Sequence, residues 1–304
     1  MEIHPEPDWE SLYDELASAR GTALIMGMTD AGKSTLARYL IKRFIAEGSK
    51  VSLVDSDIGQ SSLGLPGTVS MRVFLDEKDV EEFRYERMSF LGTVNPAMMI
   101  SGIIHSTEMM TCLCRKKTDI ILVDTTGLVT GNIGRVLKTG KIKAVDPEAV
   151  IAVQKKDELE HILSLIDDRK IIRIRSSPEA KARSRASRFR YRNIKFAEYF
   201  AGPAIPEFAL HLNEVRFIYH GKPFSPRRAD IKEKMIIGLN HDEDTLAPGF
   251  VEESHSGMFT FRTLLESPKK INTVVLGDMI LQKMPSDGKK VNKKNNFKNV
   301  IPLT

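Results

Sequence analysis

The 304-residue chain has few of the residues that build disulfide-bonded or metal-bound proteins. Its two cysteines, Cys112 and Cys114, lack the spacing of a zinc site, so we expect two reduced core thiols. The seven histidines are scattered, which argues against a metal cage. No apolar run approaches the roughly 20 residues that a membrane-spanning helix needs. The acidic start is unlike a signal or transit peptide, and together these absences favour a cytoplasmic protein with no membrane partner.

Positive charge is concentrated in two segments, although the net charge is only +5. Residues 173–195 hold nine Lys and Arg against one Glu, and residues 281–304 hold six Lys against one Asp. The rest of the chain is therefore acidic, and the two basic segments predict polyanion binding at defined places. Residues 286–304 are expected to form a basic, flexible tail, either a solvated tail or a nucleic-acid contact.

Strand-like and helical patterns alternate along residues 1–204. This alternation predicts an α/β domain with a mostly parallel sheet flanked by helices, and the phosphate-binding loop described below makes it a P-loop NTPase fold. The expected strands are 22–27, 50–57, 83–92, 119–127, 149–154 and 170–177, and the expected helices include 33–47 and 96–115.

The pattern changes after a Gly- and Pro-containing linker at 202–206. Short apolar runs separated by turn residues predict a smaller all-β domain over residues 205–285. Its expected strands are 214–221, 234–240, 257–265 and 271–281.

A phosphate-binding loop lies between the first strand and the first helix. The sequence GMTDAGKS fits the pattern G-x-x-x-x-G-K-[ST], in which backbone N–H groups and the helix N-terminus bind phosphate oxygens. Lys33 is expected to reach the β- and γ-phosphates, and Ser34 to hold Mg²⁺. The residues expected to bind the nucleotide are Thr29, Asp30, Ala31, Gly32, Lys33, Ser34 and Thr35.

Three carboxylates follow buried strands, at the sheet edge where open α/β folds bind ligands. Asp55 and Asp57 are two residues apart and face the same way, while Asp124 has the place of a Walker-B carboxylate. Of Asp55 and Asp57, one could help to hold Mg²⁺ and the other could accept a proton from an attacking hydroxyl, and Asp124 could hold Mg²⁺ as well. Gln60 would orient a water or a substrate. The alternative is that Asp55 and Asp57 cap the following turn.

Two patterns also fit a GTPase. Residues 124–127 match D-x-x-G, and residues 154–157 weakly resemble the guanine-reading motif, with Gln154 in place of Asn or Thr. A helix start with Asp157 as N-cap explains the second pattern equally well.

Arginines crowd residues 182–200. Arg185, Arg188 and Arg192 form one helical stripe, whereas Arg183 does not fall on the same face as the last two. Guanidinium groups suit transferring phosphoryl groups and nucleic-acid backbones, although a solvated surface helix is the alternative.

Taken in order, these elements resemble the polynucleotide 5′-hydroxyl kinase family, the P-loop kinases of tRNA splicing, pre-mRNA cleavage and rRNA processing. The matching stretches are TDAGKST, DSDIGQSSLGLPGT, FLGTVNP, TTGLVTG and the arginine segment ending in EYF. The resemblance covers residues 21–202 and implies an arginine lid over about 176–200. It departs from the family at Val94 and Asn95 of FLGTVNP, and at Leu128, where many eukaryotic members have a base-stacking Trp.

The resemblance implies a role for each matched residue. Lys33, Asp57 and the lid arginines Arg183, Arg188 and Arg192 would be catalytic. Asp57 and Gln60 would contact the 5′-hydroxyl end. Thr93 and Asn95 of the clasp FLGTVNP would also bind substrate, as would Thr125 and Thr126.

The predicted activity is transfer of the γ-phosphate of ATP, or possibly GTP, with Mg²⁺, to the 5′-hydroxyl end of RNA or DNA. The alternatives are a nucleotide-hydrolysing switch and a nucleotide-binding scaffold of the same fold.

Overall fold

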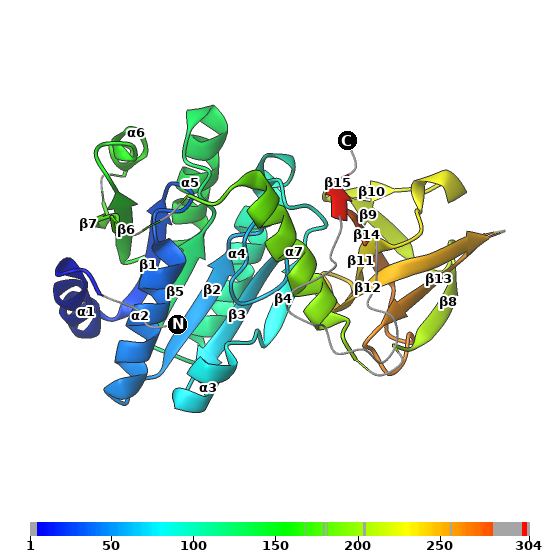
Figure 1. The fold of residues 1–304 in the computed structure, drawn as a ribbon, viewed down its shortest axis with the longest axis horizontal. Coiled ribbons are helices and arrows are strands. Elements are labelled where there is room, and N and C mark those ends of the chain that lie inside the picture. The colour runs from blue at the N-terminus through cyan, green and yellow to red at the C-terminus, as the bar shows by residue number, and fades with distance from the viewer. Residues whose placement is uncertain are drawn as a thin grey trace. The chain divides into compact units, whose positions relative to one another are not determined.

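The computed structural model describes residues 5–166, 168–178, 180, 182–202, 205–255, 257–281 and 300–302. The chain divides into two compact units (Figure 1). The first unit comprises the described residues of 1–64, 69–88 and 100–183, and the second those of 65–68, 89–99 and 184–304.

A seven-stranded sheet organises the first unit, in the order β4-β3-β2-β5-β1-β6-β7. Neighbours among the last five strands pair in parallel, and β3 runs antiparallel to β2. The strands are β1 (Gly21–Gly27), β2 (Val51–Ser56), β3 (Thr68–Phe74), β4 (Arg87–Phe90), β5 (Ile120–Thr125), β6 (Ala149–Gln154) and β7 (Lys170–Arg175). The helices are α1 (Asp8–Ala19), α2 (Lys33–Ala46), α3 (Glu77–Glu82), α4 (Ile100–Arg115), α5 (Gly131–Val145) and α6 (Glu160–Leu163).

Helices cover both faces of this sheet. Ala23 and Ile25 of β1 share a core with α1 and α2, whereas Leu24 and Met26 are equally buried and outside that core. Since successive strand residues point to opposite faces, the second pair faces the other layer, where α4 packs on β2, β5 and α5. The predicted mostly parallel sheet flanked by helices is confirmed.

No strand was predicted between residues 57 and 83, but β3 lies there. It begins directly after the turn at Pro66 and Gly67, and all of its residues are buried. The strand predicted at 83–92 shrinks to β4 (Arg87–Phe90).

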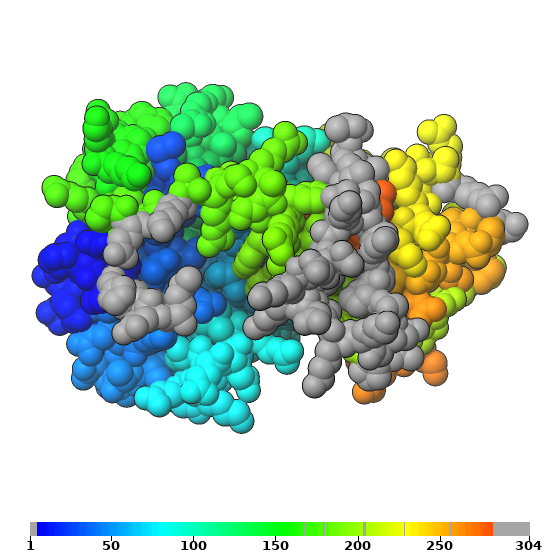
Figure 2. All heavy atoms as spheres, in the orientation of Figure 1, coloured from blue at the N-terminus to red at the C-terminus, as the bar shows by residue number. Residues whose placement is uncertain are grey.

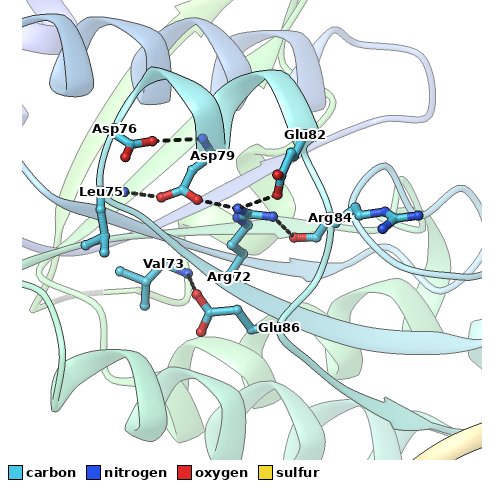
Figure 3. Close-up of polar contacts among 8 residues, drawn as sticks. All are labelled: Arg72, Val73, Leu75, Asp76, Asp79, Glu82, Arg84 and Glu86. Carbon is cyan, nitrogen blue, oxygen red and sulfur yellow. Dashed lines mark hydrogen bonds and ion pairs between the residues drawn. The ribbon is translucent and has the colours of Figure 1, made fainter.

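A buried arginine holds this segment together (Figure 3). Arg72, 8% exposed, contacts Asp79, Glu82 at 3.3 Å and the main-chain oxygen of Arg84 at 3.0 Å. Partial burial raises the pKa of Asp79, but hydrogen bonds from Leu75 N–H and Arg72 outweigh it, so the pKa is lowered. The donors and acceptors come from neighbouring parts of one short segment, although Arg72 Nε is buried without an acceptor among the described residues.

The second unit contains a largely antiparallel sheet in the order β10-β9-β14-β11-β12-β13-β8, with β15 added to β14. Its strands are β8 (Glu207–His211), β9 (Arg216–Tyr219), β10 (Lys222–Phe224), β11 (Met235–His241), β12 (Asp244–His255), β13 (Met258–Thr263), β14 (Thr273–Leu281) and β15 (Val300–Pro302). The predicted all-β domain is therefore present. Its longest strand, β12, was missed because Pro248 and Gly249 in its middle are typical of turns.

The unit boundary differs from the predicted boundary at residue 204. Helix α7 (Arg185–Tyr199) and the clasp both belong to the second unit. Phe200 after the helix packs edge-on against Phe250 at 5.0 Å, and the clasp residue Gly92 accepts a hydrogen bond from Asp278 N–H at 2.7 Å. The predicted flexible tail, 286–304, lies outside the described residues except for β15.

Two predictions on the α4 region need correction. The expected helix 96–115 is a short 3₁₀ helix, η1 (Pro96–Met98), followed by α4. Cys114 is buried, which raises its pKa to about 12, but Cys112 is exposed rather than part of a core. In the part of the chain that the structure describes, no helix combines the length and apolarity needed to cross a bilayer.

Candidate active site

The phosphate-binding loop joins β1 to α2, and two glycines fix its shape. Gly32, the N-cap of α2, has φ +94°, a left-handed conformation that favours glycine. Gly127, at the end of β5, lies so close to the loop that a Cβ atom there would be 2.4 Å from the Cα of Thr29. The glycine of the D-x-x-G pattern therefore has a packing role that does not depend on a GTPase switch.

Lys33 and Ser34 open helix α2 and reach different partners. Lys33 is 5% exposed, and its Nζ donates to the main-chain oxygen of Met28 at 2.9 Å, on the loop itself. Ser34 Oγ donates to Asp124 Oδ2 at 2.5 Å. The loop hydroxyl and the predicted Walker-B carboxylate are thus in direct contact.

The other oxygen of Asp124 is unusual. Asp124 is 1% exposed, and its Oδ1 has no hydrogen-bond donor among the described residues. Burial and the Asp55 charge raise the pKa of Asp124 to about 7. A buried carboxylate oxygen is costly without a partner. Carboxylate and hydroxyl oxygens are ligands that Mg²⁺ prefers, so Asp124 and Ser34 fit a magnesium site shared with nucleotide phosphates.

Asp55 accepts hydrogen bonds from the turn that follows it, as the turn-cap alternative predicts. It is fully buried, and its Oδ2 accepts hydrogen bonds from Ser61, from Ser62 and from Leu63 N–H at 2.9 Å. Its Oδ1 accepts from Asp57 N–H at 3.1 Å. Burial raises its pKa. Because both oxygens are engaged, Asp55 anchors the loop after β2, and Asp124 is the better magnesium ligand.

Asp57 caps the turn that follows it and keeps one oxygen available. Its Oδ1 accepts from Gly59 N–H at 3.0 Å and from Gln60 N–H at 3.1 Å, as the alternative of a turn cap predicts. No donor among the described residues reaches its Oδ2. Gln60 also retains a buried Oε1 that lacks a donor within the described part of the chain. Capping and substrate contact are therefore compatible at this turn.

The register of the sheet brings these groups to one edge. Strands β2 and β5 are parallel neighbours, with Asp55 opposite Asp124 and Ser56 opposite Thr125. Asp57 comes one residue after β2 ends. The three predicted carboxylates therefore gather at the carboxyl ends of adjacent strands, beside the phosphate-binding loop.

Two lysines behind this edge were missed by sequence reasoning. Lys138 and Lys141 of α5 are both 0% exposed. Lys138 Nζ donates to Thr125 Oγ1 at 2.6 Å and to the main-chain oxygen of Thr126. Lys141 Nζ donates to Ser56 Oγ at 2.5 Å. Lys138 thus contacts the two residues that follow Asp124. Lys141 contacts the residue between Asp55 and Asp57.

Burial dominates the titration of both lysines. It lowers the pKa of Lys138 well below the ordinary value, and that of Lys141 to about 7 even though three site carboxylates raise it. A sequence signal for them exists, since both fall within the stripe that also holds Gly134, Leu137, Ile142 and Val145. Lysines at core positions of a helix indicate a buried polar network.

The predicted substrate contacts Thr125 and Thr126 are less accessible than expected. Thr125 is 0% exposed, and its hydroxyl donates to the main-chain oxygen of Ile25 at 2.8 Å while it accepts from Lys138. Thr126 is 6% exposed. The hydroxyl of Thr125 therefore ties β5 to β1, and the structure favours a structural role for it.

The clasp residues Thr93 and Asn95 lie in the second unit. Thr93 is 1% exposed, and its Oγ1 accepts from Asn95 N–H at 3.2 Å. The Asn95 side chain caps η1 by accepting from Ala97 N–H at 3.2 Å. The departure from the family pattern at Asn95 therefore provides a helix cap.

The lid arginines are not all on one helix. Ser184 is the N-cap of α7, so Arg183 precedes the helix, while Arg188 and Arg192 lie four residues apart on it. Arg183 is exposed and the other two are half-buried. Side chains of α7 form part of the surface in view in Figure 2. The geometric mismatch between Arg183 and the other two arginines is thereby resolved.

The candidate guanine-reading motif has local partners instead. Gln154 donates to Glu160 Oε1 at 2.9 Å and accepts from Leu159 N–H at 3.3 Å. The N-cap of α6 is Leu159, so the alternative of Asp157 as N-cap was wrong. Gln154 is thereby engaged within the fold.

The strand, glycine loop and helix, with a serine and a buried acid in contact, define a P-loop protein. A family model described as "mRNA cleavage and polyadenylation factor CLP1 P-loop" matches residues 27–202. The chain belongs to this Clp1 P-loop family.

Several named relatives are polyribonucleotide 5′-hydroxyl-kinases from archaea. The chain is 31% identical to PH0197 of Pyrococcus horikoshii, over 72% of this chain and 61% of that protein. It is 34% identical to MJ1315 of Methanocaldococcus jannaschii, over 66% and 56% respectively. The chain thus spans less than two thirds of the length of these relatives.

A solved Clp1p chain, in a complex with Pcf11p, has the same fold. The TM-score is 0.76 at 10% identity, over 92% of this chain and 80% of that one. At this identity the likeness concerns the fold alone.

Proposed function

We propose that the chain is an ATP-dependent polynucleotide 5′-hydroxyl kinase that acts with Mg²⁺. The observation that carries the proposal is the pairing of Ser34 with Asp124, whose second oxygen has no donor among the described residues, next to the strand that leads to Asp57. The names of the archaeal relatives support RNA as the substrate, although DNA ends share the reacting group.

In the proposed reaction the phosphate-binding loop and Lys33 hold the triphosphate. Mg²⁺, held by Ser34 and Asp124, would neutralise phosphate charge. Asp57 Oδ2 accepts the proton of the 5′-hydroxyl, whose oxygen forms a bond to the γ-phosphorus while the bond to the bridging β–γ oxygen breaks and ADP leaves. Arg183, Arg188 and Arg192 would stabilise the charge on the transferring group.

Gln60 and the clasp residues would bind the acceptor. Gln60 offers a buried oxygen without a described donor, which suits a hydroxyl of the terminal nucleotide. The clasp, with Thr93 and Asn95, would hold the end of the strand. Leu128 is half-buried and has no aromatic ring, so base stacking at that position would be weaker than on Trp.

An end-labelling assay tests this function. The protein is incubated with γ-labelled ATP or GTP and with matched RNA and DNA oligonucleotides that carry either a 5′-hydroxyl or a 5′-phosphate. We expect label only on 5′-hydroxyl ends, removable by a phosphatase, and none with Lys33→Ala. Nucleotide hydrolysis without label transfer to any oligonucleotide would support the switch alternative and overturn the kinase.

A further inference from the structure

Asp30 sits inside the phosphate-binding loop, yet its carboxylate is directed at another segment. Its Oδ2 accepts a hydrogen bond from the main-chain N–H of Arg183 at 2.8 Å. Asp30 has φ +59°, a left-handed conformation that is uncommon for residues other than glycine. A carboxylate aimed at the nucleotide would repel phosphate, so a role outside phosphate binding fits its charge.

The next loop residue is tied to the same segment. Ser176 is 5% exposed, and its Oγ donates to the main-chain oxygen of Ala31 at 3.0 Å. Ser176 N–H also donates to the main-chain oxygen of Gln154 at 3.0 Å, which extends the β7–β6 pairing. Two consecutive loop residues, Asp30 and Ala31, therefore hold the two ends of segment 176–183.

Arg183 is the last residue of the first unit, and the helix with the other lid arginines starts directly after it. Ser184 caps this helix by accepting from Ser187 N–H at 3.1 Å. The bond to Asp30 uses the main chain of Arg183 rather than its guanidinium. The contact therefore ties the residue that precedes α7 to the phosphate-binding loop through the main chain.

We propose that Asp30 is a positioning residue that anchors the start of the arginine lid to the phosphate-binding loop. The phosphate-binding loop then sets the position of Arg183, from which the chain continues into the lid helix. This inference rests on the proposed kinase function, and it reassigns Asp30 from nucleotide binding to lid placement.

Two substitutions separate the contact from the backbone conformation. Asp30→Gly removes the carboxylate but accepts a positive φ without strain. Asp30→Asn keeps an acceptor oxygen and tolerates the left-handed region. We expect Asp30→Gly to lower kcat for end-labelling by about 10- to 100-fold, since small misplacements of catalytic groups have effects of this size. Its dissociation constant for a fluorescent ATP analogue should change less than about threefold, and Asp30→Asn should recover most of the kcat.

Amide hydrogen exchange of residues 182–186 gives a readout that does not require kinase activity. We expect faster exchange at these amides in Asp30→Gly than in wild type, and protection restored in Asp30→Asn. Because Arg183→Ala keeps the main-chain donor, it should retain wild-type protection at residue 183 while losing turnover.

Three results would overturn the proposal. These are unchanged exchange in Asp30→Gly, unchanged kcat despite faster exchange, and weakened ATP binding that accounts for the whole loss of activity. If the wild type transfers no phosphate but the exchange pattern appears as expected, the anchor stands and the proposed function fails. The two failures are therefore distinguishable.

Discussion

The first unit contains two charged clusters, and they are built in opposite ways. The cluster around Arg72 comes from one short segment, residues 72–86, in which the arginine contacts two carboxylates and a main-chain oxygen. The cluster around Asp124 gathers Lys33, Asp57, Lys138 and Lys141 from distant parts of the chain. Within the described residues, Asp124 Oδ1 in this cluster is buried without a donor.

The difference separates stability from function. The Arg72 cluster pairs its two carboxylates with its own cation, so removing Arg72 should cost stability and little else. The Asp124 cluster has a carboxylate oxygen without a donor among the described residues, and three buried lysines. These groups can still interact with a charged ligand. The following substitutions test this contrast, from the largest expected effect to the smallest.

Lys33→Met should have the largest effect, on activity. Lys33 is the cation of the phosphate-binding loop, so its loss should lower the rate of phosphate transfer by at least about 100-fold. The control is Lys42→Met, an exposed lysine on the same helix, which should retain activity in the end-labelling assay. Equal loss in both variants would show that α2 tolerates no such change and that the phosphate role is unsupported.

Arg72→Met should have the next largest effect, on stability alone. The substitution leaves Asp79 and Glu82 without their cation, and we expect the free energy of unfolding to fall by about 3 kcal/mol. Urea denaturation measures the change. Arg84→Met, whose side chain is exposed on the same segment, should cost much less. An Arg72→Met protein that keeps wild-type stability but loses turnover would contradict the assignment of this cluster to stability.

Lys141 should make stability depend on pH. Its pKa is lowered from 10.5 to about 7 in the folded chain, so between these pH values the unfolded chain binds a proton that the folded chain does not. The contribution of Lys141 to the free energy of unfolding should therefore rise with pH across this window. We expect Lys141→Met to remove that rise and Lys143→Met, an exposed neighbour, to keep it. Identical pH profiles for wild type and Lys141→Met would contradict the assignment.

Gln60→Ala should have the smallest effect. If its unpartnered Oε1 contacts the acceptor hydroxyl end, KM for the oligonucleotide should rise about 3- to 10-fold, the value of one hydrogen bond. The KM for ATP should be unchanged. A rise only in the KM for ATP would contradict this contact and would indicate that Gln60 acts on the nucleotide instead.

Much of the first unit was predictable because its signals are local. The loop GMTDAGKS needs only its own residues and flanking strand and helix to be recognised, and the strand that ends at Asp124 is a continuous apolar run. Strand β3 was missed even though Pro66 and Gly67 before it are turn residues of the kind that bound strands.

The missed parts of the site depend on distant contacts. The turn-cap alternative was open for Asp55, but the sequence does not show that Ser61, Ser62 and Leu63 supply the donors. The stripe of α5 indicates that Lys138 and Lys141 are buried, but the oxygens that they contact after β5 and β2 follow only from the tertiary structure. Residue types predicted the chemistry, whereas tertiary contacts decide which oxygen remains available.

The most direct measurement compares wild type with Asp57→Asn in single-turnover transfer to a 5′-hydroxyl oligoribonucleotide. Asparagine keeps the Oδ1 acceptor that caps Gly59 and Gln60 but cannot take a proton, so capping and chemistry are separated. We expect transfer to fall by about 100-fold or more, with unchanged ATP affinity and unfolding free energy. Transfer at the wild-type rate by Asp57→Asn would contradict the account, because Asp57 would then be a turn cap and nothing more.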